Sequence, residues 1–155
     1  MKSKIYINLD KNGIKISKPP SPQGSYVPWI ISGNYIYLSG QIPLVDGKLQ
    51  YKGTVPNEVS IDKAVDAARI CAINLINQLN EACDGDLDKI KKIVKVTGYV
   101  ACSESFIHQP TIINGASDLF KTIFGENGIH VRAAIGCSSL PLGSPVEVEA
   151  IFEKK

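Results

Sequence analysis

The sequence predicts an α+β fold in which a mixed β-sheet is covered on one face by two helices. Two segments carry apolar residues at helical spacing, and segments of alternating polarity lie before, between and after them. The chain has 155 residues, of which 44% are hydrophobic and 21% are charged. This suits a single domain over residues 1–155, because a chain of this size buries roughly 70% of its unfolded surface.

The first segments of the chain are short. Ile5 and Leu9 would share one face of a helix, whereas the isoleucines around Asn12 and Gly13 would suit a hairpin, and the pattern leaves both open. Residues 18–25 hold three prolines and predict an extended surface connection.

Residues 26–41 predict an antiparallel hairpin. Two strand-like runs, Y-V-P-W-I-I-S and Y-I-Y-L-S-G-Q, lie on either side of a turn at Gly33-Asn34. Residues 43–57 are rich in glycine and proline and predict a loop.

Two amphipathic helices follow. The first begins after Ser60, a suitable N-cap, and ends before Gly85, and a short helical turn over residues 86–92 follows it. The second begins at Pro110, which is tolerated in a first turn, and ends at Gly125. Apolar residues three and four apart form the buried stripes: Ile61, Val65, Ala68, Ala72, Leu75, Leu79 and Ala82 in the first, and Ile112, Ile113, Ala116, Leu119, Phe120, Ile123 and Phe124 in the second.

Three further strands complete the predicted order β-β-α-β-α-β-β. Residues 93–102 are predicted to place Val94, Val96, Val100 and Cys102 on one face. In residues 132–137, Arg132, Ala134 and Gly136 alternate with Ala133, Ile135 and Cys137. In residues 145–152, Val146, Val148, Ala150 and Phe152 alternate with Glu147 and Glu149. The tyrosines on the face that the helices leave open suggest a subunit interface.

Composition excludes several classes of function. A net charge of +2, with lysines in small clusters, favours a solvated surface over a nucleic-acid contact. The N-terminus has no signal-peptide pattern and no apolar run is long enough to span a membrane, so a cytoplasmic location is expected. The four cysteines lie far apart and predict reduced thiols. With two histidines in the chain, we expect no metal site and no cofactor.

Arg132 and Glu147 are the candidate catalytic residues. Arg132 is one of two arginines beside 15 lysines, and its planar guanidinium can hold a carboxylate through two parallel hydrogen bonds. Glu147 can accept a proton from water or position water for attack. A structural ion pair is the competing interpretation. Patterning does not choose between Glu147 and Glu149, which have the same orientation on the strand.

Three other positions are weaker candidates. His130 lies two residues before Arg132 and suits either a binding site or ordinary packing. The S-G-Q-I-P run that begins at Ser39 suits close approach of a ligand to the backbone, or a plain strand end. Tyr26 follows a Gly-Ser pair and would either cap a pocket or serve as a core or interface aromatic.

These residues together resemble the RidA/YjgF family, also known as Rid proteins or L-PSP endoribonucleases, from Gly24 to Phe152. The motifs are S-G-Q-I-P at Ser39, V-K-V-T at Val94, an arginine followed eight residues later by L-P, and V-E-V-E-A-I at Val146. G-S-Y-V-P, N-G-A-S-D-L and F-G-E-N-G-I-H-V-R-A-A-I-G are closer still to a longer branch of that family.

The resemblance implies a chorismate-mutase-like fold assembled as a homotrimer, with central barrel-like packing of the sheets and ligand sites between subunits. It also implies hydrolytic deamination of small enamine or imine carboxylates, of the 2-iminobutanoate and 2-aminoacrylate type, to 2-keto acids and ammonia. The ligand would be a small carboxylated imine or keto acid. By resemblance, Arg132 holds the carboxylate, Glu147 positions water, and the remaining substrate-binding positions are Tyr26, Ser39 and Asn114.

One departure stands at the site itself. Deaminating members usually have Pro-x-Arg-Ser and then a small or thiol residue, whereas this chain has His130-Val131-Arg132-Ala133-Ala134. The carboxylate clamp is therefore better supported than the deamination. The alternatives are a non-catalytic trimer that binds a small carboxylate, and an endoribonuclease, which the low charge and the lack of a histidine pair disfavour.

Overall fold

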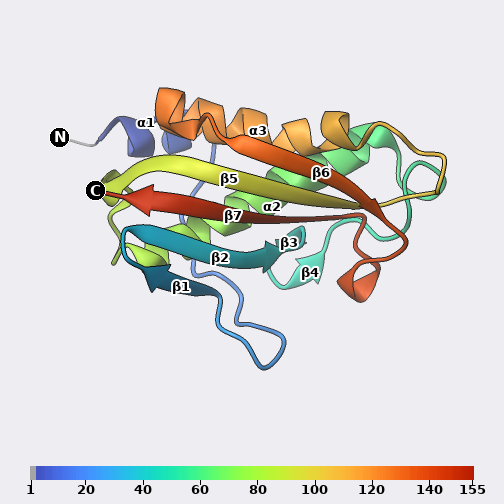
Figure 1. The fold of residues 1–155 in the computed structure, drawn as a ribbon, viewed down its shortest axis with the longest axis horizontal. Coiled ribbons are helices and arrows are strands. Elements are labelled where there is room, and N and C mark those ends of the chain that lie inside the picture. The colour runs from blue at the N-terminus through green and yellow to red at the C-terminus, as the bar shows by residue number, and fades with distance from the viewer. Residues whose placement is uncertain (1–2) are drawn as a thin grey trace.

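The structure is a computed structural model that describes residues 3–155, and it confirms the predicted α+β class. Its main sheet has five strands in the order β1-β2-β7-β5-β6, which Figure 1 shows from the lower edge to the upper. All neighbours are antiparallel except β5 and β6, which are parallel. The strands are β1 (Trp29–Ser32), β2 (Tyr35–Gln41), β5 (Ile90–Ala101), β6 (Val131–Cys137) and β7 (Val146–Lys154).

Two long helices, α2 (Ile61–Ala82) and α3 (Gln109–Phe124), cover one face of this sheet, and α3 runs alongside β5 and β6 (Figure 1). Ser60 caps α2 as predicted, since its hydroxyl accepts a hydrogen bond from the backbone N–H of Lys63 at 3.3 Å. Gly125 ends α3 with a φ of 62°, which glycine adopts without strain. The stripe predicted for α3 is buried in full.

The last two strands, β6 and β7, follow one another in the sequence but are not neighbours in the sheet. β5 lies between β6 and β7. The reason is the connection β5-α3-β6: a strand that returns through a helix pairs in parallel with the strand it left. β6 therefore becomes an edge strand, and β7 pairs with the other side of β5.

The face predicted for Val94 was also wrong. In β5, Ile93 pairs with Phe152 and Lys95 with Ile151, so Val94 is the extra residue of a β-bulge. The bulge resets the alternation, and Ile93 and Val96 point into the core while Val94 is only half-buried.

Several short elements add to the predicted order. The ambiguous N-terminal segment forms a helix, α1 (Lys4–Lys11), and the predicted loop contains a small hairpin of β3 (Leu44–Val45) and β4 (Lys48–Leu49). The helical turn expected after α2 is present as η1 (Leu87–Lys89). Two more single turns, η2 (Gly125–Gly128) and η3 (Pro141–Gly143), flank β6. Across residues 3–155 no helix is long and apolar enough to cross a membrane.

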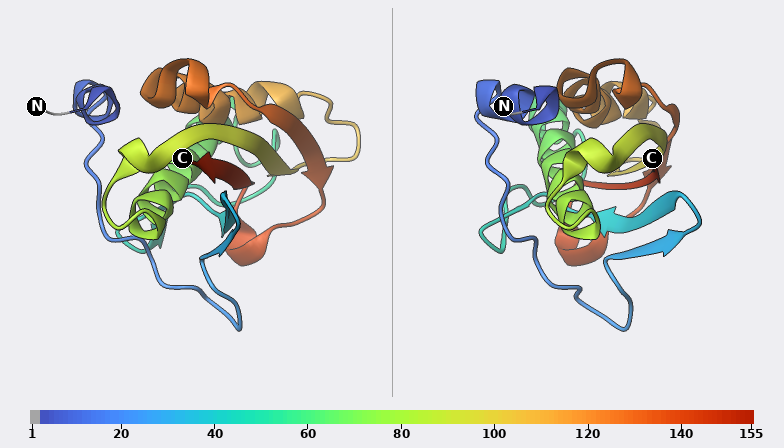
Figure 2. Two further views of the ribbon diagram at one scale, coloured as in Figure 1. Left: turned by 60° about the vertical axis from the view of Figure 1, so that its left-hand side comes forward. Right: turned by 90° about the vertical axis from the view of Figure 1, so that its left-hand side faces the viewer.

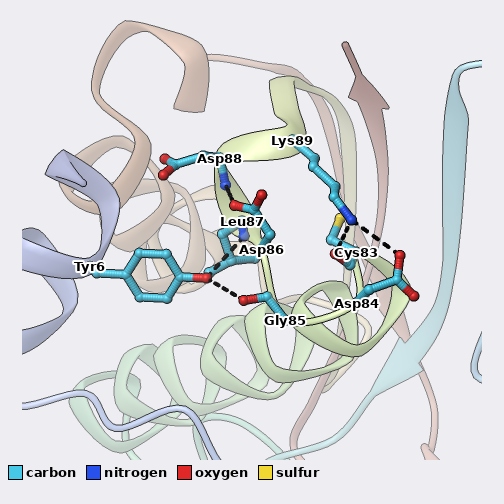
Figure 3. A network of polar contacts seen from close by, with 8 residues as sticks. All are labelled: Tyr6, Cys83, Asp84, Gly85, Asp86, Leu87, Asp88 and Lys89. Carbon is cyan, nitrogen blue, oxygen red and sulfur yellow. Dashed lines mark hydrogen bonds and ion pairs between the residues drawn. The ribbon is translucent and has the colours of Figure 1, made fainter. Parts of the chain in front are cut away.

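Tyr6 fastens α1 to the turn that follows α2. Its hydroxyl donates to the carbonyl of Gly85 at 2.8 Å and accepts from the N–H of Leu87 at 3.0 Å (Figure 3). Lys89 reaches back to the carbonyl of Cys83 at 2.9 Å, which also accepts a hydrogen bond from the N–H of Asp86 at 3.2 Å at the end of the helix. α1 thereby lies beside α3 (Figure 2), on the helical side of the molecule.

The second face of the sheet is not covered by any helix formed by residues 3–155. Tyr37 is 41% exposed and Ile30, its partner on β1, 59%, and Tyr35 and Ile135 are exposed as well. Glu147, Glu149 and Tyr99 lie on this face too, because their neighbours along the strands, such as Val146 and Val148, point into the core. We refer to it below as the open face.

Candidate functional site

Arg132 lies on β6 and reaches onto α3. It pairs in the sheet with Val96, which is fully buried beneath the helices, so both point to the helical side. Its Nη1 donates to Asn114 Oδ1 at 2.8 Å and to Ser117 Oγ at 3.1 Å, and its Nη2 donates to the Pro110 carbonyl at 3.4 Å. Three N–H donors thus fix one end of the guanidinium.

The other edge of Arg132 remains available. Its Nε–H and the second Nη2–H have no acceptor within residues 3–155, and these two donors lie side by side on a guanidinium. Arg132 also lines an open depression of about 310 Å³. Its walls come from α3, η2 and the start of β6: Asn114, Ser117, Asp118, Lys121, Gly128, Ile129, His130 and Arg132. This edge can receive a planar carboxylate through two parallel hydrogen bonds.

His130 joins this group through Ser117. Its Nε2 lies 2.9 Å from Ser117 Oγ and its Nδ1 lies 2.7 Å from the carbonyl oxygen of Gly128. Partial burial, and secondarily the charge of Arg132, lower the pKa of His130 below its ordinary range, although the Gly128 carbonyl opposes this. Burial and the charge of Arg132 therefore favour the neutral imidazole. Both ring nitrogens are thus engaged within the chain. The substrate-binding role considered for His130 from its place beside Arg132 stays a prediction.

Glu147 lies on the open face. Neither of its carboxylate oxygens bonds to a protein donor among residues 3–155, whereas Glu149 accepts a hydrogen bond from the Tyr99 hydroxyl at 3.2 Å. Burial, and then the charge of Glu149, raise the pKa of Glu147. Of the two carboxylates that the pattern could not separate, Glu147 is the one without a protein partner, so it suits proton transfer better.

A bulge in β2 places Gly40 beneath Glu147. Between Leu38 and Gln41 the strand has one residue more than β7, and any side chain at Gly40 would overlap the Glu147 carboxylate. The S-G-Q-I-P run therefore allows a close approach to its backbone, and the group that approaches within this chain is Glu147. The approach of a ligand to this run stays a prediction.

Ser39 directly precedes Gly40 in β2, and Tyr26 lies in the segment that precedes β1. The Ser39 hydroxyl donates to the Val27 carbonyl at 2.7 Å and so ties β2 to the segment before β1. Tyr26 is 52% exposed, and its hydroxyl accepts a hydrogen bond from the N–H of Gln23 at 3.4 Å. Both positions lie toward the β1–β2 edge, far along the strand order from β6.

The predicted site residues thus form two groups. Arg132, Asn114 and His130 come together on the helical side at the β6 edge, and we call them, with Ser117, the arginine group. Glu147 lies on the open face together with Gly40, next to Ser39, and we call these, with Tyr26, the glutamate group. The pattern missed Ser117, although its spacing of three from Asn114 puts both on one face of α3.

Neither group resembles a metal centre. Among the residues that the structure describes, no three histidine, cysteine, aspartate or glutamate side chains are placed to share an ion. The four cysteines are free; Cys71 and Cys83 are buried as predicted, and Cys102 and Cys137 are half-buried.

Known proteins and one protein family are similar to this chain over nearly its full length. The family model described as "YjgF/chorismate mutase-like, putative endoribonuclease" matches residues 8–153. Protein TCP17 of Trypanosoma cruzi is 38% identical over 97% of this chain and 94% of its own. The 2-iminobutanoate/2-iminopropanoate deaminase of Rattus norvegicus is 31% identical over 89% of this chain and 86% of its own. The crystal structure of Atu1372 from Agrobacterium tumefaciens, of unknown function, is 41% identical with a TM-score of 0.92, covering 98% of this chain and 93% of that one.

Proposed function

Because this chain belongs to the YjgF/chorismate mutase-like family, we propose that it hydrolyses small imines or enamines that carry a carboxylate, of the 2-iminobutanoate type, to a 2-keto acid and ammonia. A rat relative at 31% identity carries the name of that activity. The observation that carries the proposal is the Arg132 guanidinium: α3 holds it at one end, two of its N–H donors have no acceptor among residues 3–155, and the residue lines a depression.

Arg132 binds the substrate carboxylate, and Glu147 acts as the general base that takes a proton from water. Glu147 takes a proton from water as the water oxygen bonds to the imine carbon, and it returns this proton to the nitrogen to give a carbinolamine. Glu147 then transfers the hydroxyl proton of the carbinolamine to the same nitrogen, the C–N bond breaks as the carbonyl forms, and ammonia leaves. A carboxylate whose pKa is raised is a better base than an ordinary one, since base strength follows pKa. The chemistry consumes one water and needs no redox partner.

The two groups must come from different chains for this to work. Arg132 and Glu147 lie on opposite faces of the sheet, so a single chain cannot present both to one small substrate. An assembly in which the open face of one chain meets the β6 edge of the next would unite them. A homotrimer with the open faces inside satisfies this requirement and covers the exposed tyrosines and isoleucines.

The direct test is imine loss. 2-Iminobutanoate is generated in situ and its disappearance followed with wild type, Arg132→Ala and Glu147→Gln. We expect acceleration over buffer by wild type alone. A variant of Thr122, a hydroxyl residue on α3 outside the depression, serves as control and should keep the activity of wild type. Equal rates for wild type and buffer would overturn the proposal.

A second candidate is a non-catalytic protein that binds small carboxylates. It is favoured by the fact that the arginine group is complete within one chain, whereas the glutamate group is not joined to it. Glu147→Gln would then leave carboxylate binding and biological function unchanged. An endoribonuclease is disfavoured by the net charge of +2 and by a His130 whose ring nitrogens are both occupied.

A further inference from the structure

We infer that His130 and Ser117 are positioning residues: neutral His130 accepts the hydroxyl proton of Ser117, and Ser117 thereby presents a lone pair that fixes the guanidinium of Arg132. This inference rests on the proposed carboxylate clamp. It assigns to two side chains a function that neither performs by touching the substrate.

The hydrogen-bond directions follow from what each atom can do. The Gly128 carbonyl only accepts, so His130 Nδ1, 2.7 Å away, must carry a proton. In the neutral ring Nε2 is then an acceptor, and the only proton that Ser117 has can point to it across 2.9 Å. The lone pairs of Ser117 Oγ are left to face Arg132 Nη1 at 3.1 Å. Each hydrogen bond thus has one donor and one acceptor: Arg132 donates to Ser117, Ser117 donates to His130, and His130 donates to the Gly128 carbonyl.

The imidazole itself is held on two further sides. The ring meets the Phe120 ring edge-on, with centroids 6.0 Å apart and planes at 89°, and Phe120 is fully buried in the core. The Gly128 carbonyl comes from η2, immediately after α3. The orientation of Nε2 is thus set by the core and by the end of α3, before any ligand arrives.

The protonation state of His130 decides whether these hydrogen bonds can form in the directions given. A cationic His130 would donate from Nε2 to Ser117 and bring a second positive charge beside Arg132. The other charged groups lining the depression are Asp118 and Lys121, both on α3. Burial and Arg132 favour the neutral ring, in agreement with the directions derived above.

The consequence for binding is preorganisation. Arg132 is half-buried, and a long flexible side chain loses conformational freedom when it clamps a ligand. Asn114 and Ser117 already restrict the Arg132 side chain in the free protein. Ligand binding therefore costs less conformational entropy, and the affinity is higher. Removal of the Ser117 hydroxyl, or of the acceptor that orients it, is expected to weaken carboxylate binding about fivefold, the worth of one hydrogen bond.

The test is a double-mutant cycle on the affinity for 2-oxobutanoate, measured by calorimetry at pH 7. The variants are Ser117→Ala, His130→Asn and the double variant. Asparagine can keep the bond to Gly128 but is too short to reach Ser117. Because His130 acts through Ser117, the double variant should bind as weakly as Ser117→Ala alone, and Ser117→Thr, which keeps the hydroxyl, should bind as wild type does. Thr122→Ala, which removes a hydroxyl from the same helix away from the depression, is the control.

Each outcome decides the matter. Losses that multiply in the double variant, or wild-type affinity in His130→Asn, would overturn the positioning role while the clamp stands. If wild type itself does not bind 2-oxobutanoate, the clamp is wrong and the inference falls with it. A long-range nitrogen–proton NMR spectrum adds a readout independent of binding, and it must show the proton of His130 on Nδ1. A proton on Nε2 contradicts the inference.

Discussion

Arg132 and Glu147 lie on opposite faces of one sheet, separated by the strand β5. Arg132 pairs with the buried Val96 and points to the helices, whereas Glu147 pairs with Tyr99 and points to the open face. The strand order, with β5 between β6 and β7, places the two side chains on different strands as well as on different faces. A site that contains both would need a second chain.

Mixed oligomers should recover activity that the single variants lack. We expect assemblies of Arg132→Ala chains alone, or of Glu147→Gln chains alone, to be inactive. In a mixed assembly, one kind of interface has the intact Arg132 of a Glu147→Gln chain and the intact Glu147 of an Arg132→Ala chain. Co-expression with two different tags, followed by tandem purification, isolates such assemblies for the imine assay. Activity no greater than that of the separate variants would contradict a site built between chains.

The pH dependence of imine hydrolysis should report on Glu147. Burial and the charge of Glu149 raise its pKa, so the ionised base is lost as pH falls through a value above the ordinary one of about 4.3. Glu149→Gln removes the like charge and should move this acid limb to lower pH. Glu153→Gln on the same strand, where Glu153 pairs with Lys91 at 2.8 Å, is the matched control and should leave the limb in place. Rates corrected for the buffer reaction provide the measurement.

Gly40→Ala should separate catalysis from binding. The new methyl group would overlap the Glu147 carboxylate, which can swing away because it is the flexible end of a side chain. We expect kcat to fall by about a hundredfold, since small displacements of a catalytic group have effects of this size. Binding of 2-oxobutanoate by Arg132 should weaken far less. A kcat equal to that of wild type would argue against a role for Glu147.

Gly115→Ala should destabilise the fold. Here a methyl group would overlap the backbone carbonyl of Val65 where α3 crosses α2, and backbone cannot move aside cheaply. The clash outweighs the better helix propensity of alanine, and we expect a loss of about 2 kcal/mol in the free energy of unfolding. Urea denaturation measures it. Thr122→Ala, an exposed position on the same helix, should change stability by less than about 0.5 kcal/mol.

The sequence by itself determined most of the elements. Periodicity located α2 and α3 and their buried stripes, and glycine, proline and serine marked their ends, because these signals depend on residues within one or two turns of each other. It also singled out Arg132, Asn114 and Glu147. Ser117 could also have been predicted from the sequence, since it lies three residues after Asn114 on the same helical face.

The tertiary structure alone decided which of these residues meet. Strand order depends on the β5-α3-β6 crossover and not on any local pattern, so periodicity could not place β5 between β6 and β7. The bulges at Val94 and at Ser39-Gly40 likewise follow from pairing with a distant strand. Alternation along a strand says which residues share a face, but the face that the helices cover is chosen by packing, and this choice sets Arg132 and Glu147 apart.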